Sequence, residues 1–202
     1  MSKPFASSAD TAAKTDTLEI LGDGVYALTA EGDPNVGAVE GEDFVVAIES
    51  RATPAASREW LKILRQQTDK PVRYLILTHY HAVRVLGASA FEAGDIIMSD
   101  ASRDLVAERG EQDWKSEFGR MPRLAKNAEE VPGLTWPSIT FAREYDIDLG
   151  GGRGKLELRF LGRGHTGGDI VVWHDKTRTL YAGDLVEAKA ALYTGDAYHF
   201  DW

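Results

Sequence analysis

The feature that most constrains the fold is an apolar stretch that leads directly into two closely spaced histidines. Residues 74–77 are Tyr, Leu, Ile and Leu, and His79 and His81 follow almost at once. A short apolar run of this kind is typical of a strand buried on both faces. Because residues two apart in an extended chain point the same way, the two imidazoles can converge just past the strand's end. Open α/β sheets tend to bind their ligands at that position.

The composition indicates one soluble domain in which any metal must be held by His, Asp or Glu. The 202 residues are enough for a hydrophobic core, and the absence of cysteine excludes disulfides, zinc fingers and cysteine nucleophiles. The 32 acidic and 23 basic residues give a net charge of −9, which disfavours a nucleic-acid partner. Apolar runs are too short to span a membrane. We expect a cytoplasmic protein, or a periplasmic one if Met1 replaces a removed signal peptide.

The first half of the chain predicts a disordered leader, an antiparallel meander and then a helix. Residues 1–16 are rich in Ser, Ala and Thr, which favours disorder, and residues 17–202 form the predicted domain. Two hairpins follow, with strands at 18–21, 25–29, 36–39 and 44–48. Thr53 and Pro54 are good residues for a helix start, so a helix is predicted from there to about residue 67. It leads into the histidine strand.

The second half alternates short strands with two helical stretches. A short helix is predicted at 83–91 and a long, charged one at 100–121, which we expect to flank the core. The expected strands are 96–98, 139–141, one ending near Ile147, 155–161, 170–173 and 179–182. The glycine-rich stretch 148–154 has no helix after it, so we interpret it as a hairpin turn rather than a phosphate-binding loop. His174 is expected in an exposed turn, and His199 in an exposed tail.

Three strand ends share one design, in which small residues follow the strand and a potential metal ligand is exposed. They carry His79 and His81, then His165, then Asp184. The stretches that contain them are Thr78-His79-Tyr80-His81, residues 164–169 (Gly-His-Thr-Gly-Gly-Asp) and Ala182-Gly183-Asp184. In order and spacing these stretches resemble the metallo-β-lactamase superfamily. The resemblance implies an α+β fold, namely an αββα sandwich of two mixed sheets with helices on the outer faces.

The resemblance also implies a metal-dependent hydrolase. His79, His81 and His165 would hold one zinc ion with an open fourth position, and the zinc would lower the pKa of bound water so that a hydroxide attacks the substrate. Asp184 would bind the metal, orient the water or act as general base. The implied substrate is a small ester, thioester, lactone or amide. We interpret Asp169 as a structural hydrogen-bond acceptor.

Two departures from the family pattern carry predictions of their own. Val83 and Arg84 stand where the family has an Asp and a His for a second metal, so we expect one metal, with Arg84 pairing with Asp184 and offering a positive charge to a substrate carboxylate or a developing oxyanion. The chain also stops at Trp202, before the family's later strands. A sheet edge left unpaired in this way would favour a homo-oligomer.

Two other functions remain open at this stage. His79, His165 and Asp184 form a two-histidine, one-carboxylate set that would suit a single iron, as in the family's sulfur dioxygenases. A relative that kept the fold and lost the metal would instead be a metal-free binding domain.

Overall fold

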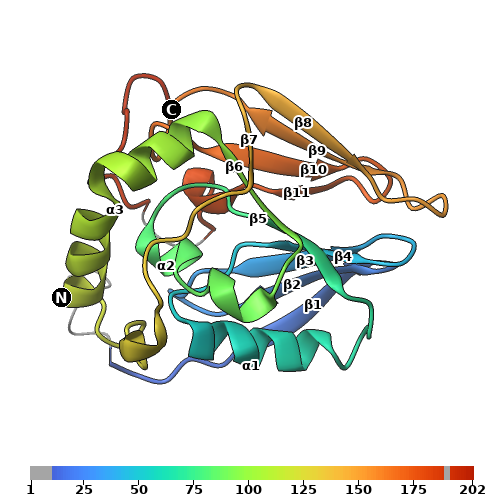
Figure 1. The fold of residues 1–202 in the computed structure, drawn as a ribbon, viewed down its shortest axis with the longest axis horizontal. Helices are drawn as coiled ribbons and strands as arrows, with labels where there is room; N and C mark the ends of the chain where they lie inside the picture. Colours follow the sequence, from blue (N-terminus) through green and yellow to red (C-terminus); the bar gives the residue numbers. More distant parts are fainter. Residues whose placement is uncertain (1–10, 189–191) are drawn as a thin grey trace.

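The computed structural model of the chain describes residues 11–188 and 192–202. Within them, two β-sheets lie face to face, and the helices pack against the outer face of the larger sheet (Figure 1). The predicted α+β sandwich is therefore confirmed. In the described residues, however, helices cover the outer face of the larger sheet and not both outer faces as expected, and the smaller sheet is antiparallel rather than mixed. Of the expected leader, residues 1–10 lie outside the described part of the chain, and residues 11–16 adopt neither helix nor strand.

The larger sheet contains seven strands that follow one another in sequence order. Its first four strands are antiparallel and confirm both predicted hairpins, whereas the remaining contacts, from the fourth strand to the seventh, are parallel. The strands are β1 (Thr17–Gly22), β2 (Val25–Thr29), β3 (Val36–Glu40), β4 (Val45–Ile48), β5 (Val72–Ile76), β6 (Asp95–Ser99) and β7 (Ile139–Phe141).

Strand β5 is buried on both faces, as its apolar run predicted. Leu75 and Leu77 pack into the cluster between the sheet and the helices. Ile76 points the other way, into the cluster between the two sheets. The alternation of a strand thus places one apolar side chain in each core, and it fixes the direction in which the chain leaves the sheet toward His79.

Helix α1 (Pro54–Leu64) connects β4 to β5 and covers the sheet. The Thr53 hydroxyl accepts a hydrogen bond from the backbone N–H of Ala56 at 3.3 Å, which caps the helix as predicted. Trp60 and Leu64 are fully buried against the sheet. The helix ends at Leu64, so the predicted end at residue 67 was too late.

The single helix predicted at 83–91 was wrong, because the chain forms two short helices there. These are α2 (Ala82–Val85) and the 3-10 helix η1 (Ala88–Phe91). Gly87 lies between them, and its N–H donates to the carbonyl of Arg51 at 2.9 Å. A Cβ at this glycine would lie 2.1 Å from Ser57 Oγ, so only glycine permits this approach to the start of α1.

The long helix α3 (Asp100–Arg120) begins at Ser99, whose hydroxyl accepts from the N–H of Ser102. It runs along one side of the molecule (Figure 1), as a flank with few buried residues. The 3-10 helix η2 (Ala128–Glu130) follows it. Among the residues that the structure describes, no helix combines the length and apolar character needed to cross a lipid bilayer.

The smaller sheet is antiparallel, with the strand order β11-β10-β9-β8. Its elements are β8 (Glu144–Asp148), β9 (Lys155–Phe160), β10 (Ile170–His174), β11 (Thr179–Tyr181) and the 3-10 helix η3 (Gly183–Leu185). The glycine-rich stretch forms the β8–β9 hairpin turn, as predicted.

The prediction that His174 is exposed was wrong. His174 is the last residue of β10 and only 2% exposed, because Ile170, Val172 and His174 share the inner face of the strand. Its ring nitrogens are satisfied there by the Thr177 hydroxyl at 2.7 Å and the Arg153 carbonyl at 2.9 Å. His174 is therefore a buried structural residue.

Candidate metal centre

The structure brings together all four residues that the sequence proposed as metal ligands. His79 and His81 follow β5, His165 lies in the loop between β9 and β10, and Asp184 lies in η3 after β11. One donor atom from each residue lies within 4.8 Å of the others. The centre therefore lies where strand ends from both sheets meet.

The loop that carries His79 is held by both sheets. The Thr78 N–H donates to a carboxylate oxygen of Glu49 at 2.8 Å, and Glu49 follows the neighbouring strand β4. The Thr78 carbonyl accepts from the N–H of Ile170, the first residue of β10, at 2.9 Å. The strand end is therefore fixed on two sides.

Gly183 allows Asp184 to approach the histidines. Its φ of +54° lies in the left-handed region, and a Cβ there would lie 2.3 Å from Thr78 Oγ1. With glycine at this position, Asp184 Oδ2 lies 3.5 Å from Nε2 of His79 and 3.5 Å from Nε2 of His165. The carboxylate thus faces the two rings that the iron hypothesis selected.

The loop that carries His165 is closed by Asp169. Its carboxylate accepts from the N–H of Thr166 at 2.6 Å and from the Thr166 hydroxyl at 2.9 Å. The interpretation of Asp169 as a structural acceptor is confirmed. It fixes the turn that presents His165.

The hydrogen bonds on the outer side of the rings determine which nitrogens face the centre. His165 Nδ1 lies 3.1 Å from the Tyr193 carbonyl, which can only accept, so Nδ1 carries the proton and Nε2 is bare. His79 Nδ1 lies 3.0 Å from the Thr78 hydroxyl. His79 Nε2 is buried and has no hydrogen-bond partner within residues 11–188 and 192–202.

These donors fit a divalent metal ion. His165 Nε2 and His81 Nδ1 are 3.0 Å apart. Two ligands of one tetrahedral ion, each at about 2.0–2.1 Å, lie about 3.3 Å apart. A cation between the rings would also satisfy the orphaned His79 Nε2, which otherwise costs free energy in a buried site. Three imidazoles and a carboxylate are ligands that suit zinc or iron.

The charge states of these residues also suit metal binding. Burial lowers the pKa of His79 to about 3 and that of His165 to about 4. Both rings are therefore neutral at pH 7, which is the form that coordinates metal. Burial by itself raises the pKa of Asp184, but Arg84 and the neighbouring histidines outweigh it and hold this pKa well below its usual range.

Arg84 forms the predicted pair with Asp184. Its Nη2 donates to Asp184 Oδ1, and its Nη1 donates to the Asn35 carbonyl at 2.6 Å. The Arg84 side chain is 11% exposed, and its Nε has no hydrogen-bond partner in the part of the chain that the structure describes. Val83 is buried beside it and offers no donor atom. A fixed positive charge therefore stands where the family's second-metal ligands would lie.

The expectation that the metal site opens toward solvent was wrong for this conformation. His79, His81 and His165 are at most 3% exposed. Residues 192–202, here called the covering segment, lie over them beside α3 (Figure 1), and the rings of Tyr193 and Trp202 contact His165. This cover could not be predicted, because it brings a distant part of the chain onto the histidines.

Sequence reasoning missed two acidic residues around the centre. Glu49 follows an apolar strand next to β5, so the strand-end argument that selected the histidines would have found it. Asp196 does not follow a strand, so no sequence pattern marks it. The tertiary fold brings its carboxylate to 3.7 Å from His81 Nε2. His199 is exposed, as predicted.

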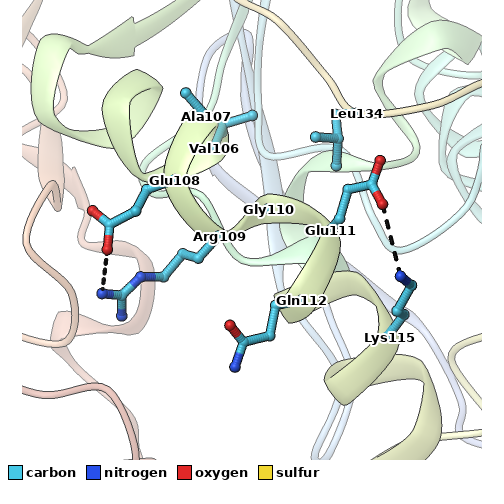
Figure 2. A pocket seen from close by; sticks show the side chains of 9 residues that line it. All are labelled: Val106, Ala107, Glu108, Arg109, Gly110, Glu111, Gln112, Lys115 and Leu134. Atoms are coloured by element: carbon cyan, nitrogen blue, oxygen red, sulfur yellow. Dashed lines mark hydrogen bonds and ion pairs between the residues drawn. The ribbon is translucent and has the colours of Figure 1, made fainter.

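A separate hollow lies beside α3 and is not part of the centre. Its volume is about 500 Å³, and Gly110 and Leu134 are among the residues that line it (Figure 2). Its polar wall contains the ion pairs Arg109–Glu108 and Lys115–Glu111. None of the four candidate ligands lines it.

Comparison with known proteins agrees with this arrangement. The family model of the metallo-beta-lactamase superfamily matches residues 29–202. A metallo-beta-lactamase type 2 from Bacillus cereus is 27% identical over 161 residues, which is 78% of this chain and 54% of the relative. The alpha subunit of 2,4-dinitroanisole O-demethylase from Nocardioides sp. (strain JS1661) is 25% identical over 165 residues, 80% of this chain and 42% of that protein. The chain thus spans about half the length of these relatives.

Solved structures share the fold. A metallo-beta-lactamase from Pontibacter korlensis superposes with a TM-score of 0.69 and 22% identity, over 91% of this chain and 79% of that one. The structure of TMB-1 gives a TM-score of 0.66 and 17% identity, over 91% and 78% of the two chains. Because the family match covers most of the sequence, the chain belongs to the metallo-beta-lactamase superfamily.

Proposed function

We propose that this chain carries the centre of a metal-dependent hydrolase that uses one metal ion. The observation that carries the proposal is the convergence of His79, His81, His165 and Asp184, with a buried His79 Nε2 that has no hydrogen-bond partner among the described residues. These residues would hold the ion, preferably zinc. A zinc ion in such a site lowers the pKa of its water toward neutrality and supplies a nucleophile.

The residues of the chain would supply orientation and charge. Asp184, kept ionised by Arg84, would ligate the metal or orient the attacking water. Arg84 would place positive charge where negative charge develops during attack on a carbonyl. We propose a small ester, thioester, lactone or amide as substrate. The covering segment lies over the ligands, so substrate entry would require it to move.

Metal analysis tests the proposal. Protein purified without added metal is analysed, reconstituted with zinc, and assayed on ester, thioester, lactone and β-lactam substrates. About one zinc per chain with hydrolysis of one class is expected. Bound iron with oxygen uptake would favour the two-histidine, one-carboxylate oxidoreductase. A chain that takes up no zinc would be a metal-free binding domain.

Replacement of single histidines provides the matched control. His165→Ala removes a proposed ligand and should reduce zinc toward none, whereas His199→Ala removes an exposed imidazole outside the centre and should leave zinc unchanged. Circular dichroism should show that both variants keep their strands. Equal zinc content in the two variants would contradict the assignment.

A further inference from the structure

We propose that the covering segment, residues 192–202, positions the metal ligands, through the Tyr193 carbonyl and the Asp196 carboxylate. The inference rests on the metal site proposed above and assigns it an outer shell that strand-end motifs do not contain. Metal binding and docking of this segment would then strengthen each other.

The first contact determines the proton position on His165. Its Nδ1 donates to the Tyr193 carbonyl at 3.1 Å, which leaves Nε2 bare and directed at the other donors. An acceptor that binds the outer ring N–H in this way fixes the tautomer and the orientation of a metal-binding imidazole. Because the acceptor is backbone, its position depends on how the whole segment is seated.

The second contact faces His81. The Asp196 Oδ2 lies 3.7 Å from His81 Nε2, slightly beyond hydrogen-bond length. Without an ion, His81 Nδ1 donates to the bare His165 Nε2 at 3.0 Å, and an ion that replaces this proton leaves the His81 proton on Nε2, where the Asp196 carboxylate favours it. Asp196 is itself held in place, because Oδ2 accepts from the Tyr80 hydroxyl at 2.6 Å and Oδ1 accepts from Arg109 at 2.9 Å. His81 and His165 would therefore present opposite ring nitrogens to the metal.

The segment is anchored to the same loops that carry the ligands. The Tyr198 N–H donates to the Gly164 carbonyl at 2.8 Å, next to His165. The Trp202 indole N–H donates to the Leu185 carbonyl at 3.2 Å, next to Asp184, and its ring centre lies 5.8 Å from that of His165. Together with the hydrogen bond from Tyr80 to Asp196, these contacts join the segment to all three ligand-bearing loops.

This arrangement couples two equilibria. A docked segment holds the rings in the orientation that binds metal, so it raises metal affinity. By thermodynamic linkage, bound metal must favour docking by the same factor. Loss of an outer-shell partner typically lowers metal affinity 10–100-fold.

The test compares two aspartates of the segment. Asp196→Ala removes the carboxylate that faces His81, whereas Asp201→Ala removes one that forms an ion pair with the exposed Arg163. Competition with a chromophoric chelator should show zinc affinity about 10–100-fold weaker for Asp196→Ala and nearly unchanged for Asp201→Ala. Because bound zinc should favour docking of the segment, zinc should also slow chymotrypsin cleavage after Tyr193. The slowing should be smaller in Asp196→Ala than in the wild-type chain.

A second readout separates positioning from general loss of structure. In zinc-bound protein, two-bond ¹H–¹⁵N spectra of the imidazoles should show His81 protonated on Nε2 and His165 on Nδ1, whereas without the ion His81 Nδ1 donates to the bare His165 Nε2 at 3.0 Å. Asp196→Ala should shift the His81 Nε2 resonance of the zinc-bound protein and leave the resonances of His165. Tyr80→Phe removes the hydroxyl that holds Asp196 in place and should also lower the zinc affinity. This variant replaces Asp196→Ala in the test if Asp196→Ala does not fold.

The outcomes are distinct. Wild-type zinc affinity and unchanged His81 resonances of the zinc-bound protein in Asp196→Ala, or in Tyr80→Phe in its place, would overturn the positioning role. Zinc that leaves chymotrypsin cleavage unaffected would overturn the coupling. A wild-type chain that binds no zinc would instead refute the proposed function itself.

Discussion

Arg84 forms a buried ion pair with Asp184 beside the three histidines. Two of its nitrogens are committed to Asp184 and to the Asn35 carbonyl, so it acts as a fixed charge. We expect Arg84→Ala to keep about one metal per chain and to lower kcat by about 10²–10³-fold, the effect of losing one oxyanion-stabilising group. Metal analysis and steady-state kinetics check both expectations.

Two further variants define the role of this charge. Arg84→Lys keeps the positive charge but lacks the planar guanidinium with its several N–H donors. Its kcat should therefore fall less than that of Arg84→Ala. Val83→Asp combined with Arg84→His should raise the metal content toward two. Unchanged turnover in Arg84→Ala would reduce this residue to a structural partner of Asp184.

Gly183 can be substituted without replacing any of the four candidate metal ligands. Gly183→Ala places a Cβ 2.3 Å from Thr78 Oγ1 and should displace Asp184, so zinc affinity should fall at least tenfold. Gly152→Ala is the control, because Gly152 also has a left-handed φ, of +70°, but has open space around it. Both variants pay a similar backbone cost of about 1–2 kcal/mol. Equal zinc affinities in a chelator competition would show that the close approach is not required.

At the scale of elements, Glu40 connects the meander to the loop before β5. Its carboxylate accepts from the Tyr26 hydroxyl at 2.7 Å and from Lys70 Nζ at 2.7 Å. Burial alone would raise the pKa of Glu40, but these two hydrogen bonds outweigh it and lower this pKa below 4.5. A lowered pKa stabilises the fold above the unfolded-state pKa, and that stabilisation is lost as the pH falls through the folded-state pKa.

Glu40→Gln should therefore cost stability in a pH-dependent way. At pH 7 we expect the variant to be less stable by about 1–3 kcal/mol, the usual worth of hydrogen bonds to a charged group. The difference from wild type should shrink as the pH falls below 4.5. Urea unfolding of both metal-free proteins at several pH values measures it. A difference that stays constant with pH would mean that the carboxylate charge is not involved.

The elements that the sequence predicted correctly are those with a local physical cause. Thr53 and Pro54 start α1 through capping and a preset backbone angle, and the apolar run of β5 needs two buried faces. Gly87 and His174 could not be interpreted locally. The break at Gly87 comes from its bond to Arg51. His174 is buried because β10 continues through it on the inner face of the sheet, and its ring nitrogens find two partners at least three residues away.

The same distinction applies to the centre. Each candidate ligand follows a strand and is visible in its own motif, so the ligand set could be predicted before the fold was known. The covering segment could not, because Tyr193 and Asp196 meet His165 and His81 across 28 residues or more of sequence. A motif shows which atoms a site offers, but only the fold shows what covers them.

At the scale of the whole molecule, the outer face of the smaller sheet is divided into two halves. On β8 and β9, Asp146, Glu157 and Arg159 form a network of ion pairs. On β10 and β11, Trp173 lies opposite Leu180, which is 51% exposed. In the part of the chain that the structure describes, no helix packs on this face, and the outer edge of β11 has no strand partner.

We therefore propose that this chain self-associates through the edge of β11. An unpaired strand edge offers backbone donors and acceptors to a second copy, and the adjacent apolar side chains would be buried on pairing. Light scattering should show a mass that rises above that of one chain with concentration. Leu180→Lys, which puts a charge on the edge strand, should weaken this rise, whereas Leu161→Lys should not, because Leu161 is 73% exposed but follows β9 away from the edge. A constant single-chain mass over the whole concentration range, with cooperative melting, would show that the edge is not a site of association.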